Sequence, residues 1–180
     1  YASRLAGKEE IPAIVREMDD DTATILMVDS NLQREHILPS ERAKAYKMKL
    51  EALRHQGKRT DLTSCQVDTK LRADEELAKQ TGESARTIQR FVRLNNLIPE
   101  LLDLVDEKKI VFNPAVELSY MKPEEQKDFF EAMELAQTTP SLSQAQRLKK
   151  LSQEGNCTAE IIESIMDEDK KNPFDRVVFD

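Results

Sequence analysis

The clearest structural signal in the chain is ADEELAKQTGESARTIQRFVRL, residues 73–94. Two helices joined by a tight turn need a small residue where they touch, a glycine in the turn and an apolar anchor on the second helix. Ala78, Gly82 and Ile88 stand at the required relative spacings of four and ten. A serine hydroxyl at position 84 suits the cap of the second helix. The stretch therefore predicts a helix-turn-helix unit.

The outward face of the second predicted helix is basic. Helical spacing places Ala85, Arg86, Gln89, Arg90 and Arg93 on that face, and no acidic residue interrupts them. Arginine can donate a bidentate pair to guanine, and glutamine can do the same to adenine. The alternative is an ordinary helical hairpin with solvated arginines. We expect DNA contacts from the cap and from this face, at Ser84, Arg86, Thr87, Gln89, Arg90 and Arg93.

The charge of the chain is unevenly distributed. The formal net charge is -7, yet seven basic residues face one acid between Arg42 and Arg59, for a local charge of +6. Residues 99–139 carry ten acids and four lysines. An acidic protein with such an asymmetry can still present a cationic face to phosphates. We therefore add Lys47 and Arg59 to the predicted DNA contacts, although the charges could also belong to ordinary solvated helix faces.

Composition favours a mainly α fold. The 180 residues include only four glycines and seven prolines, too few for the frequent turns of a barrel or sandwich. The short β-branched run from Ile11 to Val15 predicts a strand, so we expect a small N-terminal α/β remnant before a multi-helix helix-turn-helix domain. No apolar run is long enough to cross a bilayer. Cys65 and Cys157 lie too far apart to signal a zinc site.

Three segments resemble one known family. SNLQREHILPSERAKAY (30–46) looks like the ENxQR signature region of ParB-type partition proteins, in the ParB/RepB family. AGKEEIPAIVR (6–16) resembles the AGxxxIPxxVR segment that precedes that signature in the family. LAKQTGESARTIQRFVRLNNL is similar to its DNA-reading unit, including a polar residue, Glu83, between glycine and serine. The order and spacing of these segments agree with those of the family over roughly residues 2–137.

The resemblance implies a bacterial protein of the cytoplasm and nucleoid that binds a palindromic, centromere-like DNA site as a homodimer. Its implied partner is a partition ATPase of the ParA type. It implies three parts: residues 1–60 as the C-terminal part of a nucleotide-binding domain, 61–138 as the helix-turn-helix domain, and 139–180 as C-terminal helices and tail. The segment 113–119 replaces a GHAR-like segment. We interpret the chain as an N-terminally truncated, divergent plasmid or mobile-element member.

The resemblance also implies that the N-terminal part binds CTP with magnesium and acts as a CTPase switch. Arg34 matches the phosphate-binding arginine, and Asn31 matches the metal-binding asparagine. Ser30, also assigned to the nucleotide site, stands where the family usually has glutamate. The arginine-rich GxRR motif would fall before Tyr1. We therefore expect this fragment to bind CTP poorly and to be inactive as an enzyme.

Two other functions remain open from the residues themselves. A helix-turn-helix transcriptional regulator would use the same DNA-contacting face near a promoter. An all-helical adaptor would touch protein only, through the acidic helices between Glu100 and Glu134. The adaptor predicts no binding to any duplex, whereas the regulator and the partition protein differ in where their sites lie.

Overall fold

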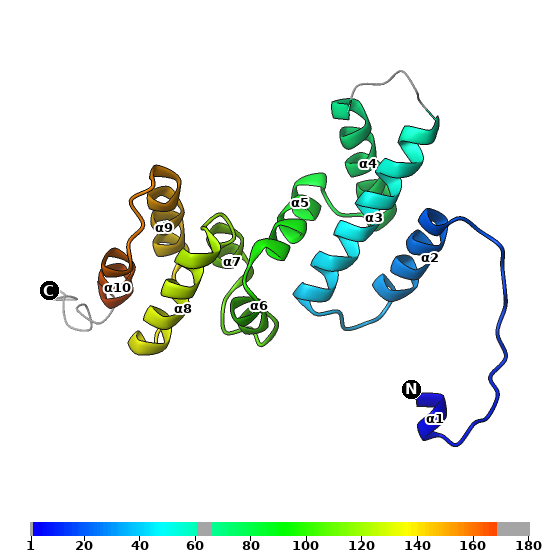
Figure 1. Ribbon diagram of the computed structural model, residues 1–180, viewed down its shortest axis with the longest axis horizontal. Coiled ribbons are helices and arrows are strands. Elements are labelled where there is room, and N and C mark those ends of the chain that lie inside the picture. Colours follow the sequence, from blue (N-terminus) through cyan, green and yellow to red (C-terminus); the bar gives the residue numbers. More distant parts are fainter. Residues whose placement is uncertain (1, 61–65, 169–180) are drawn as a thin grey trace, which may run out of the picture.

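The computed structural model describes residues 2–60 and 66–168, and side chains for 4–56 and 73–168. Helices are the regular secondary structure of the described chain, and no strand occurs in it. Figure 1 shows them following one another along an elongated molecule. They are α1 (Ala2–Leu5), α2 (Asp20–Leu32), α3 (Pro39–Thr60), α4 (Gln66–Thr81), α5 (Ala85–Arg93), the 3-10 turn η1 (Leu94–Asn96), α6 (Pro99–Asp106), α7 (Phe112–Leu118), α8 (Pro123–Ala136), α9 (Leu142–Glu154) and α10 (Ala159–Asp167).

The predicted mainly α fold is confirmed, but the predicted strand is wrong. The backbone from Ile11 to Val15 is not in a strand, and the side chains of Ile11, Ile14 and Val15 are 58%, 85% and 91% exposed. A β-branched run forms a strand only where a neighbouring strand takes its backbone hydrogen bonds. The described residues offer no such neighbour, and Figure 1 shows the segment running apart from α2–α10.

A first core lies between α3, α4 and α5. Its apolar side chains recur at helical spacing on α3 and meet the inner faces of the next two helices. Helix α2 packs along α3 and buries Val28. The first core consists of Tyr46, Leu50, Leu53, Ala73, Leu77 and Ile88.

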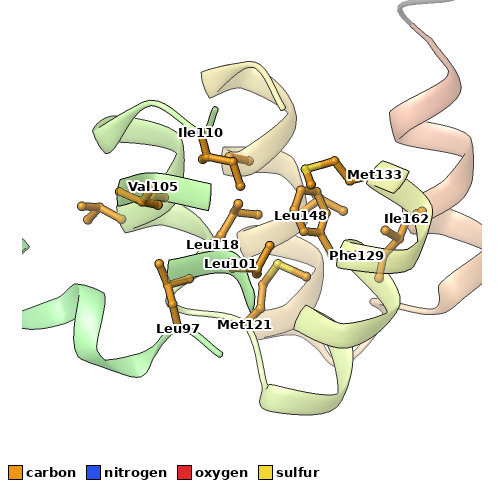
Figure 2. Close-up of a cluster of buried hydrophobic side chains, with 14 of the residues drawn as sticks. Leu97, Leu101, Val105, Ile110, Leu118, Met121, Phe129, Met133, Leu148 and Ile162 are labelled. Carbon is orange, nitrogen blue, oxygen red and sulfur yellow. The ribbon is translucent and has the colours of Figure 1, made fainter. Parts of the chain in front are cut away.

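A second core joins α6, α7, α8, α9 and α10. Figure 2 shows side chains from these helices and from the segment before α6 pointing toward one another. Prolines set two of the helix starts, since Pro99 and Pro123 open α6 and α8 as the sequence predicts. The labelled members of the second core are Leu97, Leu101, Val105, Ile110, Leu118, Met121, Phe129, Met133, Leu148 and Ile162.

Helix α5 lies where the two cores meet. Phe91 packs against both, with ring centroids 5.8 Å from Tyr46 and 4.6 Å from Phe112. The Asn95 amide, one turn later, donates to the carbonyl of Ala43 on α3 at 2.9 Å. The helix that carries the predicted DNA-contacting residues is therefore supported from both sides.

Candidate nucleic-acid interface

Helices α4 and α5 form the predicted helix-turn-helix. Gly82 has a φ of +72°, in the left-handed region where a β-carbon costs about 1 kcal/mol or more. Leu77 on α4 and Ile88 on α5 are fully buried, and Ala78 is partly buried against the same core. The small residue, the glycine and the anchor thus occupy the places that their spacing predicts.

The predicted cap of α5 is also present. The backbone N–H of Thr87 donates to Ser84 Oγ at 3.1 Å, and the two hydroxyl oxygens lie 2.8 Å apart. Both residues were predicted to contact DNA. Because the cap uses both hydroxyl groups, their first role in the structure is to fix the start of α5.

The three arginines of α5 have different surroundings. Arg86 is exposed, and no hydrogen bond or ion pair engages it among the described residues. Arg90 Nη2 donates to Asn113 Oδ1 at 2.6 Å, and its guanidinium lies over the Phe112 ring at 5.1 Å. Neither contact involves a carboxylate, so both arginines keep their charge available to a nucleic acid.

Arg93 is tied to the second half of the molecule. Its Nη2 donates to the carbonyl of Ser119 at 3.2 Å, and its guanidinium stacks 3.9 Å from the Tyr120 ring centroid. Lys149 approaches the same ring at 3.9 Å while its Nζ pairs with Glu117 at 2.8 Å. Arg93 therefore connects α5 to α7 and α9, whether or not it also contacts DNA.

The expectation that no acid interrupts this face needs a correction at Gln89. Its amide Nε2 donates to Asp74 Oδ2 at 2.7 Å, and Arg54 of α3 pairs with the other oxygen of that carboxylate at 3.2 Å. Asp74 is buried on α4, one helix away. The prediction used the residues of α5 alone, so it could not include an acidic residue from the neighbouring helix.

The basic block between Arg42 and Arg59 is also less cationic at the surface than its sequence predicts. Arg42 pairs with Glu83 at 3.2 Å. Lys49, 1% exposed, pairs with Asp29 of α2. Arg54 pairs with Asp74 as well, so three of the seven cations of the block join neighbouring parts of the helical structure.

Two other cations of the block are exposed. A third residue of the block, the predicted DNA contact Arg59, lies outside the described side chains. Lys44 and Lys47 are exposed on α3. Because they stand three residues apart on a helix, they lie close to one face. Among the cations of this block whose side chains the structure describes, Lys44 and Lys47 are thus the exposed ones.

The residues that match the family's nucleotide site lie at the end of α2. Ser30, Asn31 and Arg34 are all exposed. Asn31 and Arg34 line a hollow of about 280 Å³ together with Lys44, and Ser30 does not line it. Two cations in one hollow suit phosphate oxygens.

The resemblance also assigns magnesium to this end of α2, through Asn31. Glu41 lines the hollow, but its carboxylate accepts from the Leu38 backbone N–H at 3.2 Å and closes the start of α3. Among the described residues no group of three or more His, Cys, Asp or Glu side chains could hold a metal ion. Bound magnesium usually keeps several waters and takes one or two carboxylates together with substrate phosphates, so this finding leaves CTP with magnesium a prediction.

Sequence reasoning did not find several residues at this interface. The sequence patterns gave no role at this interface to Asp74, Phe112 or Asn113. Each contacts α5 across 15 to 23 residues of chain. A pattern within one helix carries no signal of such a contact.

The fold and this face define a class of protein: a helix-turn-helix protein with a basic second helix supported by a helical bundle. Residues 67–154 match the model of the ParB HTH domain. The chain is 30% identical over 149 residues to the chromosome-partitioning protein Spo0J of Thermus thermophilus, covering 83% of this chain and 48% of that protein. The chain belongs to the ParB type and carries the helix-turn-helix domain of that family.

Two further relatives show the same range of similarity. Stage 0 sporulation protein J of Bacillus subtilis is 35% identical over 106 residues, or 59% of this chain and 32% of that protein. The nucleoid occlusion protein of Listeria monocytogenes is 32% identical over 118 residues, or 66% and 36%. The matches thus span about half or less of these curated relatives. The predicted limits at residues 60 and 138 stay predictions.

Membrane insertion has no support in the described helices. Within residues 2–60 and 66–168, no helix combines the length and the apolar composition that a bilayer span requires.

Proposed function

We propose that this chain is the DNA-reading part of a partition protein that binds a palindromic, centromere-like site as a homodimer. The observation that supports it most is Arg86 and Arg90 on a capped second helix, each with a charge that no described carboxylate neutralises. A single helix-turn-helix reads a short half-site, so such modules usually dimerise on symmetric sites. Family membership and the names of the relatives favour partition over promoter control.

The proposal extends to the setting of the protein. The segment 113–119 departs from the GHAR-like segment of the family, which favours a divergent plasmid or mobile-element member. A partition ATPase of the ParA type is the proposed partner of the whole protein. CTP with magnesium stays a proposal for the whole protein, because Asn31 and Arg34 match the nucleotide-binding residues of the family.

Selection from a random duplex pool with the 180-residue chain tests the site directly. We expect a palindrome to be enriched and to bind with an affinity that falls steeply with salt. Arg86→Ala should lower affinity for the selected site about tenfold or more, and affinity for random duplex much less. Lys47→Ala should lower both equally, as a phosphate contact does. Lys127, exposed on α8, gives the matched control Lys127→Ala.

The outcomes separate the functions. Equal losses on both duplexes for Arg86→Ala would reject α5 as the reading helix. Sequencing the fragments of host DNA that the chain retains separates the two kinds of DNA-binding output. Clusters of sites near a replication or transfer origin support partition, and single sites at promoters support transcriptional regulation. Failure to bind any duplex at about 50 mM salt would support the adaptor instead.

A further inference from the structure

Arg90 differs from Arg86 in being held before any DNA arrives. Asn113 Oδ1 accepts from its Nη2 at 2.6 Å, and the Phe112 ring lies under the guanidinium at 5.1 Å. Both residues stand in the first turn of α7, which is anchored in the second core through the buried Ala115 and Leu118. The guanidinium is therefore fixed from the side and from below by a rigid element.

These contacts with α7 leave Arg90 able to bind a base or a phosphate. A guanidinium carries five N–H donors, and the bond to Asn113 uses one of them. An asparagine amide is neutral, so it orients the arginine without cancelling its charge. The nearest acid on α7 in sequence, Glu117, is already paired with Lys149 at 2.8 Å. The hydrogen bond from Arg90 to Asn113 thus leaves the positive charge and most of the donors of Arg90 available to a base or a phosphate.

Fixing the guanidinium of Arg90 in this way affects discrimination between bases more than it affects overall affinity for DNA. A free arginine loses side-chain entropy when it binds, and fixing it beforehand removes part of that cost. Bidentate readout of a base also depends on the plane of the guanidinium, which Asn113 and Phe112 set. A phosphate contact tolerates a wider range of orientations.

We propose that Asn113 is a positioning residue that sets the base preference of Arg90. The inference rests on the proposed function and goes beyond it, since it assigns specificity to a residue of α7, outside the helix-turn-helix. Asn113 acts through Arg90. The segment in which this chain departs from its family would then supply part of the choice of DNA sequence.

Two variants of Asn113 separate positioning from a structural role. Asn113→Ala removes the acceptor, and Asn113→Asp keeps an acceptor oxygen but adds a negative charge. Both suit the first turn of a helix, aspartate through the helix dipole. For Asn113→Ala we expect a three- to tenfold loss of discrimination, on the order of part of one base contact, at the base pair that Arg90 reads. Asn113→Asp should keep the wild-type preference and bind every duplex more weakly.

The readouts are the selected sequence, the affinity for the selected and random duplexes, and the melting temperature. Arg90→Ala should remove preference at the same base pair, and adding Asn113→Ala to it should change nothing further. Asn96, exposed in η1, gives the matched control Asn96→Ala, which should leave sequence preference unchanged.

Several results would overturn the inference. They are an unchanged selected sequence for Asn113→Ala, additive losses in the double variant, or a change of preference at a base pair that Arg90→Ala does not affect. A wild-type chain that selects no duplex would instead overturn the proposed function. The two failures are therefore distinguishable in one experiment.

Discussion

The two cores of this molecule differ in how far ion pairs and apolar contacts hold their helices together, although Lys149 and Glu117 also join α9 to α7 beside the second core. Around the first core, ion pairs join the helices, with Arg42 on Glu83, Lys49 on Asp29 and Arg54 on Asp74. The second core is larger among the described side chains and is mostly aliphatic.

The second core satisfies most of its buried polar groups with glutamine amides that bond to backbone, beside the buried Glu125 carboxylate, which accepts from Ser152 Oγ. Gln126, fully buried, accepts from the Ile98 N–H at 2.9 Å and donates to the carbonyls of Asn96 and Met121. Such neutral groups cost less to bury than charges do. The contrast teaches that basic residues near a DNA-binding helix can be structural, so that counting them overestimates the cationic surface.

The largest expected effect belongs to the second core. Phe129 is fully buried there, and Phe129→Ala should lower the free energy of unfolding by about 4 kcal/mol, through lost burial and the cavity that remains. Urea unfolding followed by circular dichroism measures it. A loss below about 1 kcal/mol would show that this core is loosely packed and would remove the contrast between the two regions.

The next effect tests the ion pairs of the first region. Asp29→Ala leaves the buried ammonium group of Lys49 without its partner and should cost about 3 kcal/mol. Adding Lys49→Met should recover most of that loss, because no charge is then buried. Asp103→Ala, which removes an exposed carboxylate from α6, is the matched control. Equal stability of Asp29→Ala and this control would show that the pair contributes nothing.

The smallest effect is the pH dependence that Tyr46 contributes in the first region. Burial, and then the carboxylate of Glu83, raise the pKa of Tyr46 from 10.0 to about 12. Between these values the unfolded chain has lost the phenol proton while the folded chain keeps it, so stability is complete below pH 10 and falls as pH rises toward 12. Tyr46→Phe should remove this part of the alkaline loss. Unfolding curves at pH 9 and about pH 11 compare the two chains, and equal losses would contradict the assignment.

Much of the fold could be predicted from the sequence, because its signals are local. Spacing placed Ala78, Gly82 and Ile88, a serine gave the cap of α5, and prolines gave the starts of α6 and α8. The prediction of a strand from Ile11 to Val15 is wrong for the opposite reason. Its formation depends on a partner strand, which a run of β-branched residues cannot supply.

The candidate site was predicted less completely, because its side chains depend on other helices. Arg86 is exposed as expected, but Gln89 meets Asp74 of α4 and Arg90 meets Asn113 of α7. These partners stand 15 and 23 residues away in the chain. Helical periodicity identifies the outward face of α5, whereas packing between helices decides which of its side chains are free.

The placement of the tyrosines has a spectroscopic consequence. The chain has no tryptophan and three tyrosines, so its ultraviolet emission comes from phenol rings. Tyr46 lies in the first core, whereas Tyr120 stacks between Arg93 and Lys149 beside the second. Tyr1 is the third tyrosine, so replacing it and one of these two rings by phenylalanine leaves the other ring as a reporter of its own half of the molecule, without any attached dye.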